Sequence, residues 1–233
     1  MDMITHSLAG LALGTLSGDP LSLTNPIYLS SMLGSIAPDF DVLWGYKKMK
    51  RRRDLPSWLQ HRAITHSLVG MPIIAATIAF GLHLIFAQTN FWLLFLFSLI
   101  GISSHSLLDL MNCYGVNILW PLKKKAYSLN IVPLIDPILI SFFLIMIGSV
   151  NYIKTLPPAL FLTMVSYLML RWIFFSRTRN AMSLYYAVTP NAIQMIPPPV
   201  SLRKWDFSIN EVDDISGQVV CFPRFSVMEE ENK

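Results

Sequence analysis

The chain has 233 residues, of which 53% are hydrophobic and only 14% are charged. Because soluble domains are typically about 25% charged, this composition excludes an ordinary soluble domain and indicates a membrane protein. The formal net charge of +4 is concentrated in a few short stretches. Membrane topology explains that pattern better than nucleic-acid binding does, so no nucleic-acid partner is expected.

Apolar runs cover most of the first 175 residues. Four of them approach the roughly 20 residues that cross a bilayer, and they occupy residues 64–86, 91–112, 131–150 and 157–175. Two shorter runs, 4–17 and 25–37, are expected to be tilted, half-spanning or interfacial. The sequence therefore predicts an all-α polytopic membrane protein with about four to six membrane segments. No cleavable signal is visible, so the first segment is expected to remain in the protein.

Lysine and arginine gather at three places along the chain: residues 47–53, residues 123–125, and the pair Arg177 and Arg179. With six spans, all three fall on the same side as the N-terminus, whereas Asp19 and Lys154 fall on the opposite side. This positive-inside bias predicts that both termini are cytoplasmic. An additional role in binding anionic lipid stays open for these clusters.

The character of the chain changes after Arg179. Residues 180–233 contain a proline run and two stretches of partly alternating hydrophobicity, which predict two or three strands. We therefore divide the chain into a membrane-embedded domain, residues 1–179, and a small cytoplasmic β-containing region, residues 180–233. Two widely separated cysteines, Cys113 and Cys221, give no disulfide framework.

Histidines and aspartates are unevenly distributed on this topology. If consecutive spans form hairpins, most of them fall at the cytoplasmic ends of their helices; these are His6, Asp39, Asp41, His61, His66, His105 and Asp109. Three of the histidines occur in similar contexts, THSLAG, THSLVG and SHSLLD. Ionisable groups at membrane segments are costly and are functional candidates. Histidine and aspartate together are the usual ligands of hydrolytic zinc or manganese sites. Seven potential ligands suit two ions better than one.

Local spacings support this interpretation. His105 and Asp109 are four residues apart and share one helical face. Asp39 and Asp41 follow Pro38 and, in an extended stretch, point to opposite sides, so that one could bind metal while the other orients a histidine or takes a proton. Thr65 is a plausible N-cap beside His66, and Thr5 repeats that geometry before His6.

Each residue also has a purely structural interpretation. A histidine at a helix entrance can be an interfacial hydrogen-bonding residue, Asp39 and Asp41 can belong to a turn, and Arg62 can be one more positive-inside residue. Asp136 before Pro137 is the pattern of an N-cap followed by proline. His83 lies 17 residues after His66, about 25 Å away along a helix, and is interpreted as structural. The gathering of the others at one face favours a metal site.

The motifs resemble those of a known family. In chain order they are His6 in THxxxG, Asp39 and Asp41 in PDxD, His61 to Ser67 in HRxxTHS, His105 and Asp109 in HxxxD, Asn112 to Gly115 in NxYG, Trp120-Pro121 and Asp136-Pro137. Over residues 1–175 this pattern resembles the YfhP/YdjM-like bacterial membrane-bound metal-dependent hydrolases of the inner membrane. The family is distantly similar to zinc-dependent phospholipases C, which implies phosphoester hydrolysis.

The combined expectation is a hydrolase at the cytoplasmic face of a bacterial inner membrane. One or two divalent ions, zinc first and manganese second, would activate water for attack on phosphorus or an acyl carbon. Asp39 or Asp41 could act as base, and Arg62 could hold a phosphate through its planar guanidinium. Supporting roles are expected for Thr5, Thr65, Asn112, Tyr114 and Asp136. The site's depth suits membrane lipid or another amphipathic, phosphate-bearing substrate.

Three rival functions remain open. A metal-ion transporter would also use histidine and aspartate, but normally near the middle of the bilayer, whereas here they lie at one end. A metal-dependent acyl or amide hydrolase would use a similar residue set. A non-catalytic regulator with a structural metal would usually close the shell with four ligands, often cysteine, and the surplus of ligands argues against it.

The predicted topology can be tested by cysteine labelling. With both native cysteines replaced by serine, a Met49→Cys chain should resist an impermeant maleimide in intact cells and react after permeabilisation, because the basic loop is predicted to be cytoplasmic. Lys154→Cys serves as the control and should react in intact cells. Labelling of the Met49→Cys chain in intact cells would contradict the topology.

Overall fold

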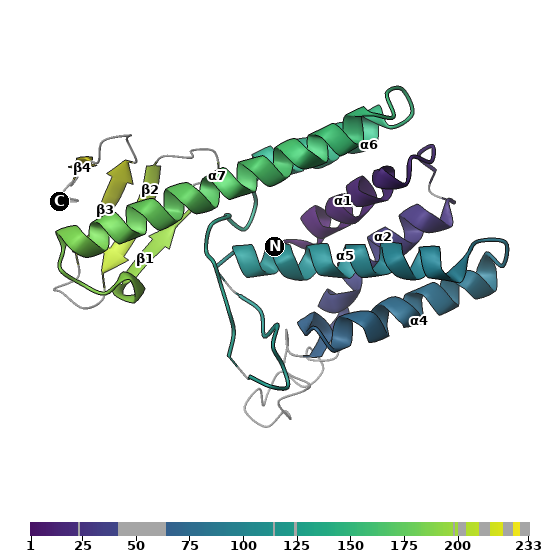
Figure 1. Ribbon diagram of the computed structural model, residues 1–233, viewed down its shortest axis with the longest axis horizontal. Helices are drawn as coiled ribbons and strands as arrows, with labels where there is room; N and C mark the ends of the chain where they lie inside the picture. Colours follow the sequence, from purple (N-terminus) through teal and green to yellow (C-terminus); the bar gives the residue numbers. More distant parts are fainter. Residues whose placement is uncertain are drawn as a thin grey trace.

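The computed structural model describes residues 1–22, 24–41, 64–113, 115–123, 125–197, 199 and 204–209, together with the backbone of 215–220 and 226–228. The basic loop 47–53, His61, Arg62 and Tyr114 lie outside the described residues. The part of the chain that is described is mainly helical, as predicted, with a sheet near the C-terminus (Figure 1).

Four helices form a bundle in which consecutive helices run back and forth (Figure 1). They are α1 (Met3–Gly14), α2 (Pro26–Ile36), α4 (Gly70–Ile85) and α5 (Phe91–Met111). Short 3-10 turns adjoin them, namely η1 (Thr15–Ser17), η2 (Ala37–Phe40) and η4 (Ile64–His66). Asp2, Asn25 and Asn90 cap α1, α2 and α5 through their side-chain oxygens. The reversals bring the end of α2, the start of α4 and the end of α5 together.

The backbones of α2 and α5 approach each other very closely. A Cβ atom added at Gly101 would lie 2.1 Å from the carbonyl oxygen of Ser31, and one added at Gly34 would lie 2.3 Å from that of Ser98. Small residues on facing helices are the usual means of close packing in membranes, where hydrophobicity drives helix association only weakly. The contact fixes α5 against α2, and with it the residues at the end of α5.

Two further helices form a hairpin beside the bundle, α6 (Pro137–Ser149) and α7 (Leu156–Tyr185), with α6 against α1 (Figure 1). The side chain of Asp136 accepts hydrogen bonds from the amides of Ile138 and Leu139, with proline at the first helical position. The structural interpretation of Asp136 is thereby confirmed. The apolar run 131–150 is only partly helical, because residues before Asp136 are bonded to the end of α5 instead.

The C-terminal region contains an antiparallel sheet in the order β1-β2-β3-β4. Its strands are β1 (Ile193–Ile196), β2 (Lys204–Ile209), β3 (Ile215–Val220) and β4 (Ser226–Met228), after the turn η5 (Pro190–Ala192). Trp205, Phe207 and Ile209 alternate along β2 and are buried in the same cluster as Phe175 and Met182 of α7. The sheet thus has four strands instead of two or three. Because α7 runs past residue 179, the domain division remains a prediction.

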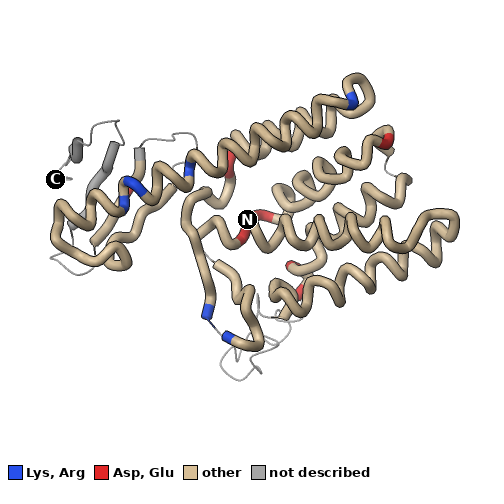
Figure 2. The backbone as a smooth tube through the Cα atoms, viewed as in Figure 1, with Lys and Arg blue, Asp and Glu red and all other residues tan. Residues whose placement is uncertain are grey.

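Two helices, α5 and α7, are long and apolar enough to cross a membrane, and three shorter helical stretches are apolar: Met3–Ser17, Gly70–Ile85 and Pro137–Ser149. Membrane association is supported, while the number of spans stays a prediction. Charged side chains of the described chain are sparse along the bundle and gather near helix ends (Figure 2). The run 64–86 is α-helical only from Gly70 onward, because residues 64–69 form the 3-10 turn η4 and a tight turn after it.

The close contact of α2 with α5 can be tested by thermal unfolding. Gly101→Ala should destabilise the protein by about 1–3 kcal/mol through overpacking, which lowers the melting temperature by about 2–10 °C for a chain of this size. Gly81→Ala is the matched control, since nothing lies within 4 Å of a Cβ atom there, and its melting temperature should be unchanged or slightly higher. Equal melting temperatures for Gly101→Ala and the parent protein would contradict the packing.

Candidate metal centre

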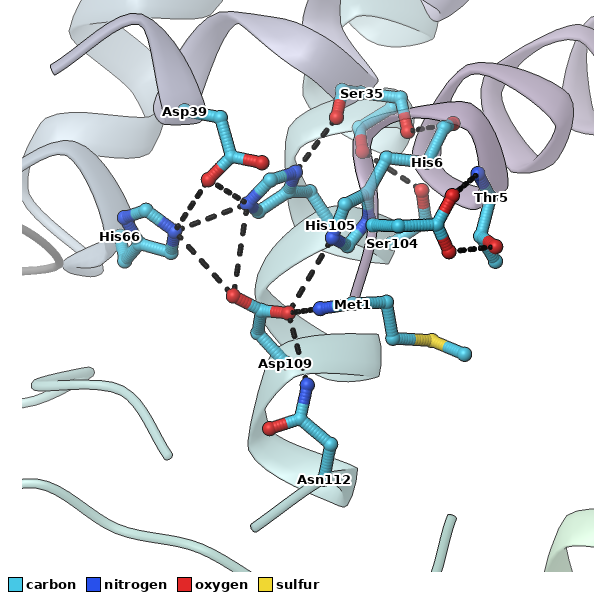
Figure 3. A network of polar contacts seen from close by, with 12 residues as sticks. Met1, Thr5, His6, Ser35, Asp39, His66, Ser104, His105, Asp109 and Asn112 are labelled. Atoms are coloured by element: carbon cyan, nitrogen blue, oxygen red, sulfur yellow. Dashed lines mark hydrogen bonds and ion pairs between the residues drawn. The ribbon is translucent and has the colours of Figure 1, made fainter. Parts of the chain in front are cut away.

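Three histidines and two carboxylates meet at one end of the bundle (Figure 3). They come from α1, η2, η4 and α5, and in chain order they are His6, Asp39, His66, His105 and Asp109. The side chain of Asp39 is 15% exposed, whereas the other four are buried. Such a concentration of ionisable groups in an apolar bundle is costly unless the groups share charges or bind a metal.

Four of these side chains are placed so that they could hold one ion. One ligand atom from each of Asp39, His66, His105 and Asp109 lies within 4.8 Å of all the others. Asp39 Oδ1 is 3.5 Å from His105 Nε2 and 4.0 Å from His66 Nε2. Asp109 Oδ2 is 3.9 Å and 3.8 Å from the same two nitrogens. Two carboxylates therefore face two imidazole nitrogens.

The hydrogen bonds on the far side of each ring fix its tautomer. His105 Nδ1 lies 2.7 Å from the carbonyl oxygen of Ser35, which can only accept, so Nδ1 carries the hydrogen. Thr65 Oγ1 donates to Asp41 Oδ2 at 2.8 Å and lies 2.9 Å from His66 Nδ1, so it accepts from His66. In the neutral form of either ring, Nε2 is therefore an acceptor.

The two Nε2 atoms of His66 and His105 are only 2.9 Å apart. Two acceptors at this distance repel one another unless a positive charge, a shared proton or a metal ion, lies beside them. Burial lowers the pKa of His66, and the neighbouring His105 lowers it further, which disfavours the proton. Burial by itself raises the pKa of Asp39, but its interactions with His105, His6 and His66 together outweigh burial and the pKa falls. Neutral imidazole and ionised carboxylate are the forms that bind metal.

His6 adds a fifth candidate ligand. Its ring stacks on His105 with centroids 3.8 Å apart, and Nε2 lies 3.3 Å from Asp109 Oδ1. The side chain is completely buried, and within the described part of the chain Asp109 is the carboxylate that its Nε2 contacts. Asp109 Oδ1 also accepts from Asn112 Nδ2 at 3.1 Å and contacts the N-terminal ammonium of Met1. The two oxygens of Asp109 therefore face two different groups.

Comparison with known proteins places the chain in a family. The family model described as YdjM inner membrane protein matches residues 1–180. The chain belongs to this family. A curated relative of this YdjM-family chain, the uncharacterized protein YfhP of Bacillus subtilis (strain 168), is 26% identical over 242 residues, covering 97% of the chain and 72% of YfhP. Among solved structures there is no match. The YfhP/YdjM-like family inferred from the sequence motifs is thus confirmed as an inner-membrane family, while the hydrolase activity stays a prediction.

Most sequence-predicted residues that fall in the described chain lie at this centre. The structure brings together His6, Asp39, His66, His105 and Asp109. Asn112 donates to Asp109, and Asp41 is linked to His66 through the hydroxyl of Thr65. Asp136 does not reach the centre; it is bonded to Arg171 and Tyr167. His83 lies in the last turn of α4, at the opposite end of that helix from His66, and its Nδ1 is 2.9 Å from the carbonyl oxygen of Thr89. That contact agrees with a structural role.

Three local expectations were wrong. Thr5 does not cap α1, because Asp2 does, and Thr5 bonds to Asp2 instead. Thr65 does not cap α4 but lies inside η4, where its hydroxyl links His66 with Asp41. Asp39 lies in a 3-10 turn and not in an extended stretch, yet its carboxylate and that of Asp41 still have different partners.

Two buried residues of functional interest were not predicted from the sequence, Ser35 beside the centre and Arg171 in α7. Ser35 orients His105 through its backbone carbonyl, which no side-chain pattern reveals, and its hydroxyl donates to the carbonyl of His6 at 2.6 Å. Arg171 is buried in α7. An arginine inside a predicted membrane span was itself a signal that could have found it.

Metal content gives a direct test of the centre. The purified protein should contain stoichiometric zinc or manganese by elemental analysis, and His66→Ala or Asp109→Ala should lose it, since each removes a buried ligand. His83→Ala is the matched control and should keep the metal, because His83 lies away from the centre. Full occupancy in both ligand variants, or no metal in the parent protein, would refute the site.

Proposed function

We propose that the protein is a membrane-bound metal-dependent hydrolase that cleaves a phosphoester of a lipid or other amphipathic substrate at the cytoplasmic face. The observation that supports it most is the pair of facing Nε2 atoms of His66 and His105, flanked by the carboxylates of Asp39 and Asp109. A set of buried nitrogens and carboxylates with orienting partners behind them is typical of a hydrolytic metal centre.

The donor set fits zinc first. Imidazole nitrogen and carboxylate oxygen are common zinc ligands, and manganese accepts the same set with more oxygen. Cys113, the cysteine among the described side chains, is exposed and lies outside this cluster, so the site does not resemble a structural zinc site rich in cysteine. Bound here, a divalent ion would supply Lewis-acid activation of water and of the bond to be cleaved.

A second ion has a natural place beside the first. Asp109 Oδ2 faces His66 and His105, while Asp109 Oδ1 faces His6. If a second ion were bound, Asp109 and the buried His6 would help to hold it. His61 is proposed to join it from outside the described residues.

The remaining residues divide into orienting and proton-handling roles. Ser35 and Thr65 hold the rings of His105 and His66 so that Nε2 faces the centre. Asn112 holds Asp109. Asp39, the ligand candidate with an exposed edge, is the one that a substrate can reach, so it is proposed to take the proton from the attacking water. Arg62 is proposed to hold the substrate phosphate.

An amphipathic substrate agrees with the surroundings of the centre. Phe40 adjoins Asp39 and is 47% exposed, and Leu68 and Val69 follow His66 and are 57% and 51% exposed. Exposed apolar side chains beside a polar site at the end of a membrane bundle suit a ligand with an apolar tail and a polar head. Because the cluster lies at one end of the bundle and not midway along it, metal transport is less favoured.

The reaction class can be determined with lipid extracts. The reconstituted protein, incubated with an inner-membrane lipid extract, should release phosphate or a phosphorylated headgroup, and a chelator should abolish the release. Asp39→Asn should lower the rate by about 100-fold or more, as expected for a general base. Asp19→Asn is the matched control; Asp19 lies after η1, at the opposite end of α1 from His6, and the variant should keep the parent rate.

The same assay distinguishes the alternatives. Chelator-sensitive release of fatty acid without phosphate would replace the phosphoesterase proposal by an acyl or amide hydrolase. Metal uptake into proteoliposomes without any lipid product would replace it by a transporter.

A further inference from the structure

A short segment between α5 and α6 is bonded to the end of the helix that carries Asp109. The amide of Leu129 donates to the carbonyl of Leu110 at 2.8 Å, and those of Ile131 and Val132 donate to the carbonyl of Met111 at 2.8 and 3.0 Å. Ser128 Oγ donates to the carbonyl of Asn112. These carbonyls belong to the last turn of α5, where helical partners are lacking. Residues 128–132 therefore serve as the C-terminal cap of α5.

The other side of residues 128–132 is held by α7 and the sheet. Arg171 Nε donates to the carbonyl of Ile131 at 2.8 Å, and Asn130 Nδ2 donates to the carbonyl of Met195 in β1. Ile131 and Val132 are buried. Figure 1 shows this segment running from the end of α5 toward α7. One strip of backbone thus connects the metal-centre helix with the C-terminal region.

Arg171 is itself rigidly held. Its Nη1 donates to Asp136 Oδ2 and to the hydroxyl of Tyr167, at 2.9 and 2.7 Å, and its guanidinium lies 5.6 Å from the ring centre of Trp205 in β2. The side chains of Arg171 and Asp136 are completely buried. A buried ion pair of this kind adds little net stability by itself but defines geometry strongly.

We propose that Arg171 is a positioning residue for the metal centre: by holding residues 128–132 against the end of α5, it fixes Asp109 and couples metal affinity to the C-terminal sheet. The coupling rests on the proposed function in that Asp109 binds the metal. The path is short, since Asp109 immediately precedes the capped carbonyls and Asn112, at the end of the helix, donates to Asp109. Displacement of the cap changes where the carboxylate lies.

The decisive variant removes the contact with Ile131 while keeping the interior neutral. Arg171→Met alone would leave the buried carboxylate of Asp136 without its cation, which threatens folding. The double variant Arg171→Met/Asp136→Asn avoids this, since asparagine still caps α6. Arg179→Met is the matched control on the same helix, because Arg179 bonds to the carbonyl of Pro190 and to Asn191 instead. If the double variant does not fold, Arg171→Lys replaces it in the test. Lysine retains the charge but cannot donate to both the carbonyl of Ile131 and Asp136 as arginine does.

Two measurements on the full chain test the coupling. Hydrogen exchange on the metal-free protein should speed up in residues 128–132 and at the end of α5 in the double variant, and not in Arg179→Met. Zinc affinity, measured by chelator competition, should weaken about 10–100-fold at unchanged stoichiometry, the range typical of residues behind metal ligands. The melting temperature of the metal-free double variant should stay near that of Arg179→Met.

The outcomes separate this inference from the proposed function. Unchanged hydrogen exchange in the double variant would overturn the claim that Arg171 holds residues 128–132 against α5, whether or not metal binds. Faster exchange with unchanged zinc affinity would overturn the positioning of Asp109. Absence of zinc from the parent protein would refute the proposed metal centre, and with it the part of the inference that concerns affinity, while hydrogen exchange would still decide whether Arg171 holds the cap.

Discussion

The contact between α2 and α5 is the constraint on which the candidate metal centre depends. Where Gly34 and Gly101 allow the two backbones to meet, the carbonyl of Ser35 comes within hydrogen-bonding distance of His105. A larger side chain at either glycine would separate the helices, and His105 would lose the partner that fixes its tautomer. The tautomer of a candidate metal ligand thus depends on packing between helices at positions that carry no charged group.

Buried histidine, aspartate and arginine side chains of the described helices and turns are found at two places. One is the cluster of three histidines and two carboxylates, and the other is the ion pair of Arg171 with Asp136. The cluster lies near the end of α5, and Asp136 lies at the start of α6. In an apolar medium each group of charges has to be balanced locally. In the first, the ammonium of Met1 contacts Asp109 and a metal would balance the remaining carboxylate, whereas the second is balanced by its own arginine.

The grouping of these residues was predictable from the sequence because it follows from the alternating direction of consecutive apolar segments. Once consecutive apolar segments are taken as hairpins, the residues at their ends must meet, and His6, Asp39, His66, His105 and Asp109 do. Two local predictions are also confirmed: His105 and Asp109 lie one turn apart in α5, and Asp136 caps α6.

What could not be predicted depends on contacts between distant segments. Residues 64–69 adjoin a long apolar run and were predicted to belong to its helix, but the chain turns tightly there, and a Cβ atom at Gly70 would lie 1.8 Å from the carbonyl oxygen of Ile64. Hydropathy does not distinguish such a turn from a helix. For the same reason Thr65 could be taken for a cap, although its partners are the side chains of His66 and Asp41. The contact of the Ser35 carbonyl with His105 and the cap of α5 involve backbone groups, so the pattern of side chains in the sequence does not predict them.

The order of the residues along the chain has a consequence for biosynthesis. All five side chains of the centre occur before residue 110, whereas Arg171 and the sheet come in the last third of the chain. Since chains are made from the N-terminus and domains form as units during synthesis, α1, α2, α4 and α5 can assemble with their candidate ligands in place before α7 is complete. The cap of α5 is then secured last, so a ribosome that stalls after α5 leaves a bundle that has its ligands but lacks the residue that holds them in position.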